Sequence, residues 1–225
     1  MLTERIQIYL DGGNFYHLVL KKMGIKDLDF DYEAFSVLIG HGRQIVPQGK
    51  RFYQGSVREK LGDSYSVRAM SKQTALFTGL QSTHWEVKTS KLRTRRERIK
   101  IDKNVEDYQN ILKKGIQEII IERVREKGID VKLATDLIVG AVDDKYDIGI
   151  VVSSDTDLIP AIDWVGKRKH KKIEYVGFSV PDNSPLQEHT RPLPTMIVHS
   201  DIQRTFTDTD LRPFIKPQAQ VIPLA

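Results

Sequence analysis

The sequence contains no cysteine and no long apolar run. Without cysteine the chain has no disulfides, no thiolate zinc site and no cysteine nucleophile, which fits a cytoplasmic protein. No stretch approaches the roughly 18 apolar residues that a membrane span needs, so we expect no membrane partner. The chain opens almost directly into a predicted strand after Arg5, and we therefore expect no secretory signal.

Several catalytic signatures are also missing. The segment from Asp11 to Asn14, Asp-Gly-Gly-Asn, is not followed by the Gly-Lys-Ser/Thr of a phosphate-binding P-loop. No Gly-x-Ser-x-Gly nucleophile elbow occurs, and the six histidines show no metal-ligand spacing. These absences exclude the common nucleotide-binding loop and the serine hydrolase, and leave the acidic residues as the main candidates for chemistry.

Positive charge is concentrated in one segment. The net charge is +5, and the span from residue 88 to residue 100 holds seven basic residues and one acidic residue. The basic residues of this strip are Lys88, Lys91, Arg93, Arg95, Arg96, Arg98 and Lys100. Such a strip favours a nucleic-acid backbone as partner. The alternative is a solvated loop without a partner, because charge runs often only keep a surface hydrated.

Hydrophobic patterning predicts alternating strands and helices. We expect strands at 6–10, 51–57, 84–89, 148–153 and 172–178 and helices at 66–78, 104–127, 132–142 and 158–168. A first helix would follow Asn14, whose side chain suits an N-cap, and a second would carry Phe35, Leu38 and Ile39. Residues 181–194 are expected to form a loop, and 195–210 a strand and a short helix. This order predicts an α/β fold, a doubly wound and mainly parallel sheet with helices on both faces.

The 225 residues suit a single domain. We expect it to span residues 1–212, with the basic loop and a long helix at about 88–127, and a flexible tail over 213–225. The long helix would end at Gly128, as helices commonly do before a glycine. Its apolar stripe could be core, or it could build a homodimer.

Acidic residues follow two predicted strands and begin a helix. Asp11 closes the first strand, Asp155 and Asp157 follow the strand 148–153, and Asp130 precedes the helix that holds Asp136. The carboxyl ends of parallel strands share one edge, so Asp11 and Asp155 would face a common cleft if their strands are neighbours. Adjacent carboxylates repel unless a cation or proton relieves them, and Mg²⁺ or Mn²⁺ would do so. Such an ion would lower the pKa of a bound water and stabilise charge on a phosphodiester.

Each acid also has a purely structural interpretation. Asp11 could be a turn residue, and Asp157 could cap the helix that begins near Pro160. Asp136, which we expect to point away from the apolar stripe of its helix, could be a surface partner of Lys132. Taken together, the acids favour a metal site.

Three segments resemble the NYN domain family of the PIN-like nuclease superfamily. They are Tyr9-Leu10-Asp11-Gly12-Gly13-Asn14-Phe15, then Lys127-Gly128-Ile129-Asp130-Val131-Lys132-Leu133-Ala134-Thr135-Asp136, then Val152-Ser153-Ser154-Asp155-Thr156-Asp157-Leu158. The segments match in order, type and spacing, and the resemblance covers about residues 6–178. It is thin between residues 43 and 125.

The resemblance implies a PIN-like three-layer α/β/α sandwich and metal-dependent cleavage of RNA. It assigns catalytic and metal-binding roles to Asp11, Asp136 and Asp155, with Asp157 as a further acid, and supporting roles to Asn14, Asp130, Lys132 and Ser154. Many relatives carry an additional acid on an earlier helix, for which Glu33 is the candidate. The open alternatives are an RNA- or partner-binding module without turnover, a DNA nuclease, and a phosphohydrolase acting on a small substrate.

Overall fold

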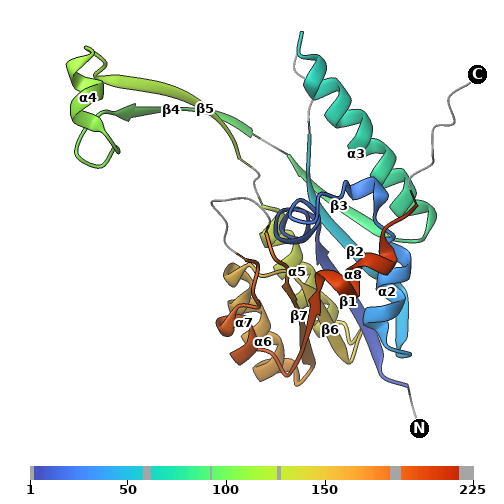
Figure 1. The fold of residues 1–225 in the computed structure, drawn as a ribbon. Helices are drawn as coiled ribbons and strands as arrows, with labels where there is room; N and C mark the ends of the chain where they lie inside the picture. Colours follow the sequence, from blue (N-terminus) through green and yellow to red (C-terminus); the bar gives the residue numbers. More distant parts are fainter. Residues whose placement is uncertain (1–2, 58–61, 92, 126–127, 183–188, 218–225) are drawn as a thin grey trace, which may run out of the picture.

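The computed structural model describes residues 3–57, 62–91, 93–125, 128–182 and 189–217. Six parallel strands form a central sheet in the order β3-β2-β1-β6-β7-β8 (Figure 1). Their bounds are β1 Arg5–Asp11, β2 Gln44–Ser56, β3 Glu86–Lys91, β6 Ile148–Val152, β7 Lys172–Ser179 and β8 Ile202–Thr207. The predicted parallel α/β sheet is confirmed.

Helices cover both faces of this sheet, which gives the predicted three layers. One face carries α1 (Gly12–Phe15), its π-helical continuation at Tyr16–Leu20, α2 (Tyr32–Gly40), α3 (Ser64–Ser82) and α8 (Asp208–Leu211). The other carries α5 (Ile129–Val142), α6 (Ile159–Lys169) and α7 (Pro194–Val198). Pro160 lies in the first turn of α6, where it costs no hydrogen bond. No described helix is long and apolar enough to cross a membrane.

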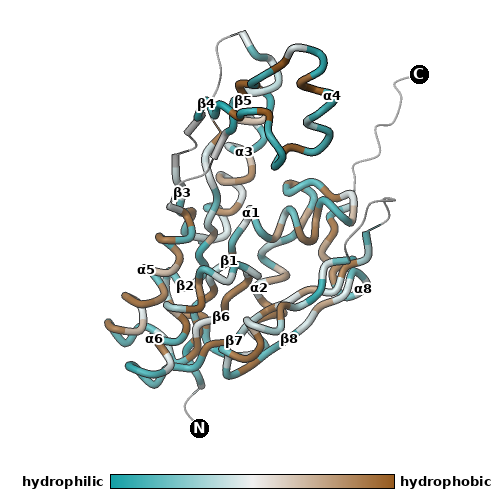
Figure 2. Tube along the Cα trace, turned by 90° about the vertical axis from the view of Figure 1, so that its left-hand side faces the viewer, coloured by the Kyte–Doolittle hydropathy of each residue, from teal (hydrophilic) through white to brown (hydrophobic). Residues whose placement is uncertain are grey.

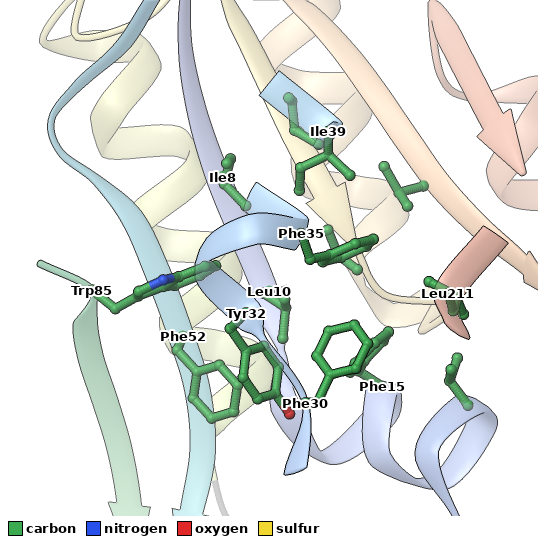
Figure 3. Packing of buried hydrophobic residues seen from close by; sticks show 14 of the residues in the cluster. Ile8, Leu10, Phe15, Phe30, Tyr32, Phe35, Ile39, Phe52, Trp85 and Leu211 are labelled. Carbon is green, nitrogen blue, oxygen red and sulfur yellow. The ribbon is translucent and has the colours of Figure 1, made fainter. Parts of the chain in front are cut away.

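The core consists of one apolar cluster on each side of the sheet. Alternate residues of β1 divide between them: Ile8 and Leu10 face α1 and α2, whereas Tyr9 faces α5. Aromatic rings dominate the first cluster, where Phe15 packs 5.2 Å from Phe30 between ring centroids (Figure 3). The all-buried β6 sits at the centre of the sheet, as its continuous apolar sequence predicts.

The order of the strands reverses between β1 and β6. From β1 the chain moves outward to β2 and β3, then returns to place β6 on the other side of β1, with Leu10 paired to Val152. A reversal of this kind leaves a crevice at the carboxyl ends of the two strands, where open α/β sheets bind ligands. Asp11 and Ser153 are the residues that directly follow this last pair.

Residues 93–125 form a projecting hairpin, hereafter the arm. It consists of β4 (Arg93–Lys100) and β5 (Glu118–Arg125), paired antiparallel, with the short helix α4 (Tyr108–Lys113) at its tip. Figure 1 shows the arm extending away from the sandwich, and Figure 2 shows its tip mixing hydrophilic and hydrophobic residues.

The predicted long helix over 104–127 is therefore wrong, and the predicted basic loop is mostly strand. Gly115 breaks the helical pattern because it adopts a left-handed backbone with φ of 79°. The β-branched run from Ile119 to Ile121 then favours a strand. The apolar spacing in this segment matched a helix by coincidence. The homodimer stays a prediction, and it can no longer be assigned to a long helix.

The C-terminal segment still packs against the core at residues 214 and 215, where the sequence predicted a flexible tail. Phe214 lies 6.1 Å from Phe30 and 5.8 Å from Phe35 between ring centroids, and its carbonyl accepts the amide of Asp31 at 2.7 Å. Ile215 forms a bridge with Phe30. The predicted flexible tail thus does not begin at residue 213, and the rest of it from residue 218 lies outside the described residues.

Candidate functional site

Asp11 ends β1 as a buried carboxylate. Its side chain is 6% exposed, and its Oδ1 accepts the amide of Asn14 at 2.9 Å, which caps the start of α1. Its Oδ2 accepts a hydrogen bond from Ser153 Oγ at 3.2 Å. A carboxylate that accepts such bonds is held in one orientation at the edge of the sheet.

The loop after β6 is tied to the loop after β1. The side-chain oxygen of Asn14 accepts the amide of Ser154 at 3.0 Å, and Ser153 Oγ accepts the amide of Asp155 at 3.2 Å. Asp155 Oδ1 in turn accepts the amide of Asp157 at 2.9 Å. These bonds run from Asp11 through Ser153 to Asp155, so the two strand ends form one unit.

These contacts correct two sequence predictions about capping. We expected Asn14 to cap the first helix and considered Asp157 as the cap of the later one. Asp11 caps α1, and Asp155 caps the 3-10 turn Thr156–Leu158 that leads into α6. α6 itself has Leu158 at its N-cap position and no side-chain cap. Asn14 is left to bridge the two loops through Ser154.

Asp130, in the first turn of α5, belongs to the same electrostatic environment. Burial raises the pKa of its carboxyl, and the negative charges of Asp155 and Asp157 raise it further. Burial and the neighbouring like charges both favour the neutral form of the Asp130 carboxyl. The described structure therefore leaves an acidic edge at the ends of β1 and β6 and the start of α5.

Asp136 lies in a different charge environment on the same side of the sheet. Its Oδ2 accepts a hydrogen bond from the Tyr53 hydroxyl at 2.8 Å and lies 3.6 Å from Arg51 Nη1. Arg51 also pairs with Glu86 at 3.2 Å. Burial and the Asp136 carboxylate raise the pKa of Tyr53, so the hydroxyl stays protonated and remains a donor. Tyr53 is the register partner of Asp11, so the tyrosine that binds Asp136 belongs to the strand next to Asp11.

The prediction for the direction of Asp136 was therefore wrong. Its side chain points toward the sheet and not away from the core, because the buried stripe of α5 runs through Leu133, Leu137 and Gly140. Lys132 is not its partner either, since Lys132 Nζ donates to the carbonyl of Thr89 at 2.5 Å. That bond links α5 to β3.

Sequence reasoning missed Arg51, Tyr53, Glu86 and Ser153. The spacing of Arg51 and Tyr53, two apart on a predicted strand, indicated that both side chains share a face. The sequence did not indicate that Asp11 lies on the same face of the sheet, because that depends on the pairing of β1 with β2.

The candidate for the additional acid, Glu33, lies elsewhere. Its carboxylate pairs with Lys50 at 2.5 Å, and Lys50 is the register partner of Ile8. Ile8 points to the face of the sheet opposite to Tyr9 and Asp11. Glu33 therefore serves an ion pair with β2 on the α2 side, away from the acidic edge.

The basic strip divides between the body and the arm. Lys88 and Lys91 belong to β3, where Lys88 pairs with Glu86 at 2.6 Å, and the other five residues belong to β4. Arg96 and Arg98 pair with Glu122 and Glu118 of β5, at 2.9 and 3.6 Å. The strip is therefore less cationic at these positions than its composition indicates.

The donor chemistry of the acidic edge fits a hydrated Mg²⁺ or Mn²⁺. Within the described residues, no three Asp, Glu or His side chains converge closely enough to form a direct metal cage. Mg²⁺ usually keeps several waters and takes only one or two carboxylates, which Asp11 and Asp155 could supply. A cation bound at this edge would offset the like charges of Asp155 and Asp157 that raise the pKa of Asp130.

Comparisons with known proteins agree with this fold. The NYN domain family matches residues 5–192. A search of curated proteins found no match. Among solved structures, a protein of unknown function from Vibrio parahaemolyticus, VPA0982, aligns with a TM-score of 0.52 at 19% identity, over 90% of this chain and 93% of that one. At that identity the likeness concerns the fold alone.

Proposed function

We propose, from the premise that this chain belongs to the NYN domain family of nuclease-like proteins, that it is a metal-dependent endoribonuclease. The observation that carries the proposal is the hydrogen-bonded unit of Asp11, Ser153 and Asp155 at the reversal point of the sheet. Nucleases of this superfamily typically use divalent metals, and Asp11, Asp155, Asp157 and Asp136 are the proposed acids. The family does not determine whether the ion is Mg²⁺ or Mn²⁺.

The residues of the chain have separable tasks in this proposal. Asp11 and Asp155 would hold the ion, which when bound supplies an activated water and stabilises charge on the phosphate. Asn14 and Ser153 keep the two strand ends in register. Asp136, held by Tyr53, would orient water or substrate from α5. The cations of β3 and β4 would hold the RNA backbone.

A second candidate is an RNA-binding domain without turnover. Two observations favour it: no three acids converge within the described residues, and Asp136 is already engaged by Arg51 and Tyr53. In that case the acidic edge would be a retained structural feature, and binding would depend only on the cations. A cytoplasmic location also stays a proposal, resting on the absence of cysteine.

Metal removal and return separate the two candidates. Labelled RNA and DNA of one sequence are incubated with protein treated with a chelator, then with Mg²⁺ or Mn²⁺ added in excess. The nuclease proposal expects RNA cleavage that stops on chelation and returns with metal. Binding without cleavage under either metal would establish the second candidate, and cleavage that survives chelation would contradict the metal dependence. Preferential cleavage of the DNA would show that the substrate is DNA and not RNA.

A further inference from the structure

The arm carries most of the net charge of the protein. Residues 93–125 hold ten Lys and Arg and six Asp and Glu, a net of +4 within a chain total of +5. An isolated two-stranded hairpin is marginally stable in water, and this one also exposes Ile119 and Ile120. A projecting element with this charge is complementary to a polyanion.

The positive charge is concentrated at the root of the arm. In the ladder, Arg95 lies directly opposite Arg123. Like charges across a strand pair destabilise it, so this arrangement disfavours the arm in isolation. The next pair, Arg96 and Glu122, has opposite charges and forms an ion pair. Arg95 has no ion pair within the described part of the chain, whereas Arg123 contacts Glu97 at 3.5 Å.

The root lies beside the acidic edge by connectivity. β4 begins two residues after Lys91, the last residue of β3, and β5 ends at Arg125, five residues before Asp130. Asp130 lies in the first turn of α5, and α5 packs against the turn Thr156–Leu158 that follows Asp155. A single polymer could therefore contact both the root of the arm and the carboxyl ends of β1 and β6.

The composition of the arm indicates which form of nucleic acid it contacts. Proteins that hold single strands use aromatic side chains on which bases stack. Between residues 93 and 125 the only aromatic residue is Tyr108, at the far tip in α4. A base-paired stem conceals its bases and offers phosphates and 2′-hydroxyls, which cations recognise without stacking. Each strand of the arm spans about 26 Å, enough to follow such a stem.

We propose that the arm binds a base-paired RNA stem next to the segment that enters the acidic edge, with Arg95 and Arg123 contacting its phosphates. This inference rests on the proposed ribonuclease function for its substrate class. It adds that the substrate is structured RNA, with paired nucleotides on the arm and unpaired nucleotides at the acids.

Equilibrium binding in the presence of a chelator tests the arm separately from catalysis. The probes are a labelled RNA hairpin with a single-stranded tail and an unpaired RNA of the same length. The variants are Arg95→Gln with Arg123→Gln and, as a charge-matched control, Lys167→Gln with Arg168→Gln at the end of α6. Cleavage is not measured, so failure of the ribonuclease proposal would leave this result interpretable.

We expect the wild type to prefer the hairpin, and the arm variant to lose roughly tenfold in hairpin affinity. Its log–log salt slope should fall by about two, one for each lost phosphate contact. The control and the affinity for unpaired RNA should change much less. The inference would be overturned if the arm variant lost equal affinity for both RNAs, or if the control variant lost as much hairpin affinity as the arm variant. It would also be overturned if the wild type bound the unpaired RNA more tightly than the hairpin. So would sedimentation showing a dimer that the arm variant abolishes, which would place a second copy on the arm.

Discussion

At the residue scale, the two adjacent glycines Gly12 and Gly13 differ in how much room a side chain would have. A Cβ added at Gly12 would lie 2.3 Å from Cζ of the buried Phe52, whereas one at Gly13 would meet only Asp11 Oδ1 at 3.6 Å. Gly12 therefore allows α1 to begin directly over the sheet, immediately after Asp11. A Cβ at Gly13 would make only an ordinary van der Waals contact.

Gly12→Ala should therefore destabilise the protein by about 1–3 kcal/mol, because the clash forces either Phe52 or the start of α1 to move. Gly13→Ala is the matched control and should change the free energy of unfolding by much less. Urea unfolding followed by circular dichroism measures both. Equal effects of the two substitutions would show that the backbone, and not the contact with Phe52, determines the need for glycine.

Asp130 should make stability depend on pH. Burial and the charges of Asp155 and Asp157 raise its pKa, so the folded protein binds this proton more tightly than the unfolded chain does. Stability contributed by the protonated form is then present below the ordinary pKa of 3.8 and is lost as pH rises through the raised value.

Asp130→Asn should accordingly raise the melting temperature at pH 7, by about 1–2 °C for a partly exposed group in a chain of this size. Near pH 3 the variant and the wild type should melt together. Thermal melts at the two pH values provide the measurement. A variant that is less stable at pH 7 would mean that the favourable interaction of the Asp130 carboxylate with the N-terminal dipole of α5 outweighs the repulsion.

At the element scale, the ends of the secondary structure elements depend on contacts distant in sequence. The sheet strands and the helices around the three family segments could be predicted, because their apolar periodicity agrees with their burial. The arm could not, since Ile116, Ile119 and Ile120 have helical spacing and no core below them to select the strand. The role of Tyr53 and Arg51 likewise depends on the register of β2 against β1.

The C-terminal segment is an element whose contribution can be measured by truncation. A chain ended after Arg212 loses the packing of Phe214 on Phe30 and Phe35 and the bond from the Asp31 amide. We expect a loss of about 2–4 kcal/mol, from one largely apolar side chain and its hydrogen bonds. A chain ended after Pro217 keeps all of these contacts and is the control. Equal stability of the two would show that the segment adds nothing to the core.

At the scale of the whole molecule, the topology brings the acids together and the arm extends outward from the same edge. Asp11 and Asp155 lie 144 positions apart in the chain numbering, yet Ser153 links them because β6 returns beside β1. The sequence could predict these acids and their shared edge. It could not predict that Asp136 is held by Tyr53 and Arg51, because that requires the packing of α5 over β2.

Single-turnover cleavage of a labelled RNA in saturating Mn²⁺ by the wild type and Asp155→Asn tests the proposed role of the acidic edge. Asp143→Asn, at the opposite end of α5 from the acidic edge, is the control for loss of one carboxylate. We expect Asp155→Asn to lower the rate on the order of a hundredfold or more, equivalent to about 3 kcal/mol, and Asp143→Asn to keep the wild-type rate. Equal rates for Asp155→Asn and the wild type would contradict the account.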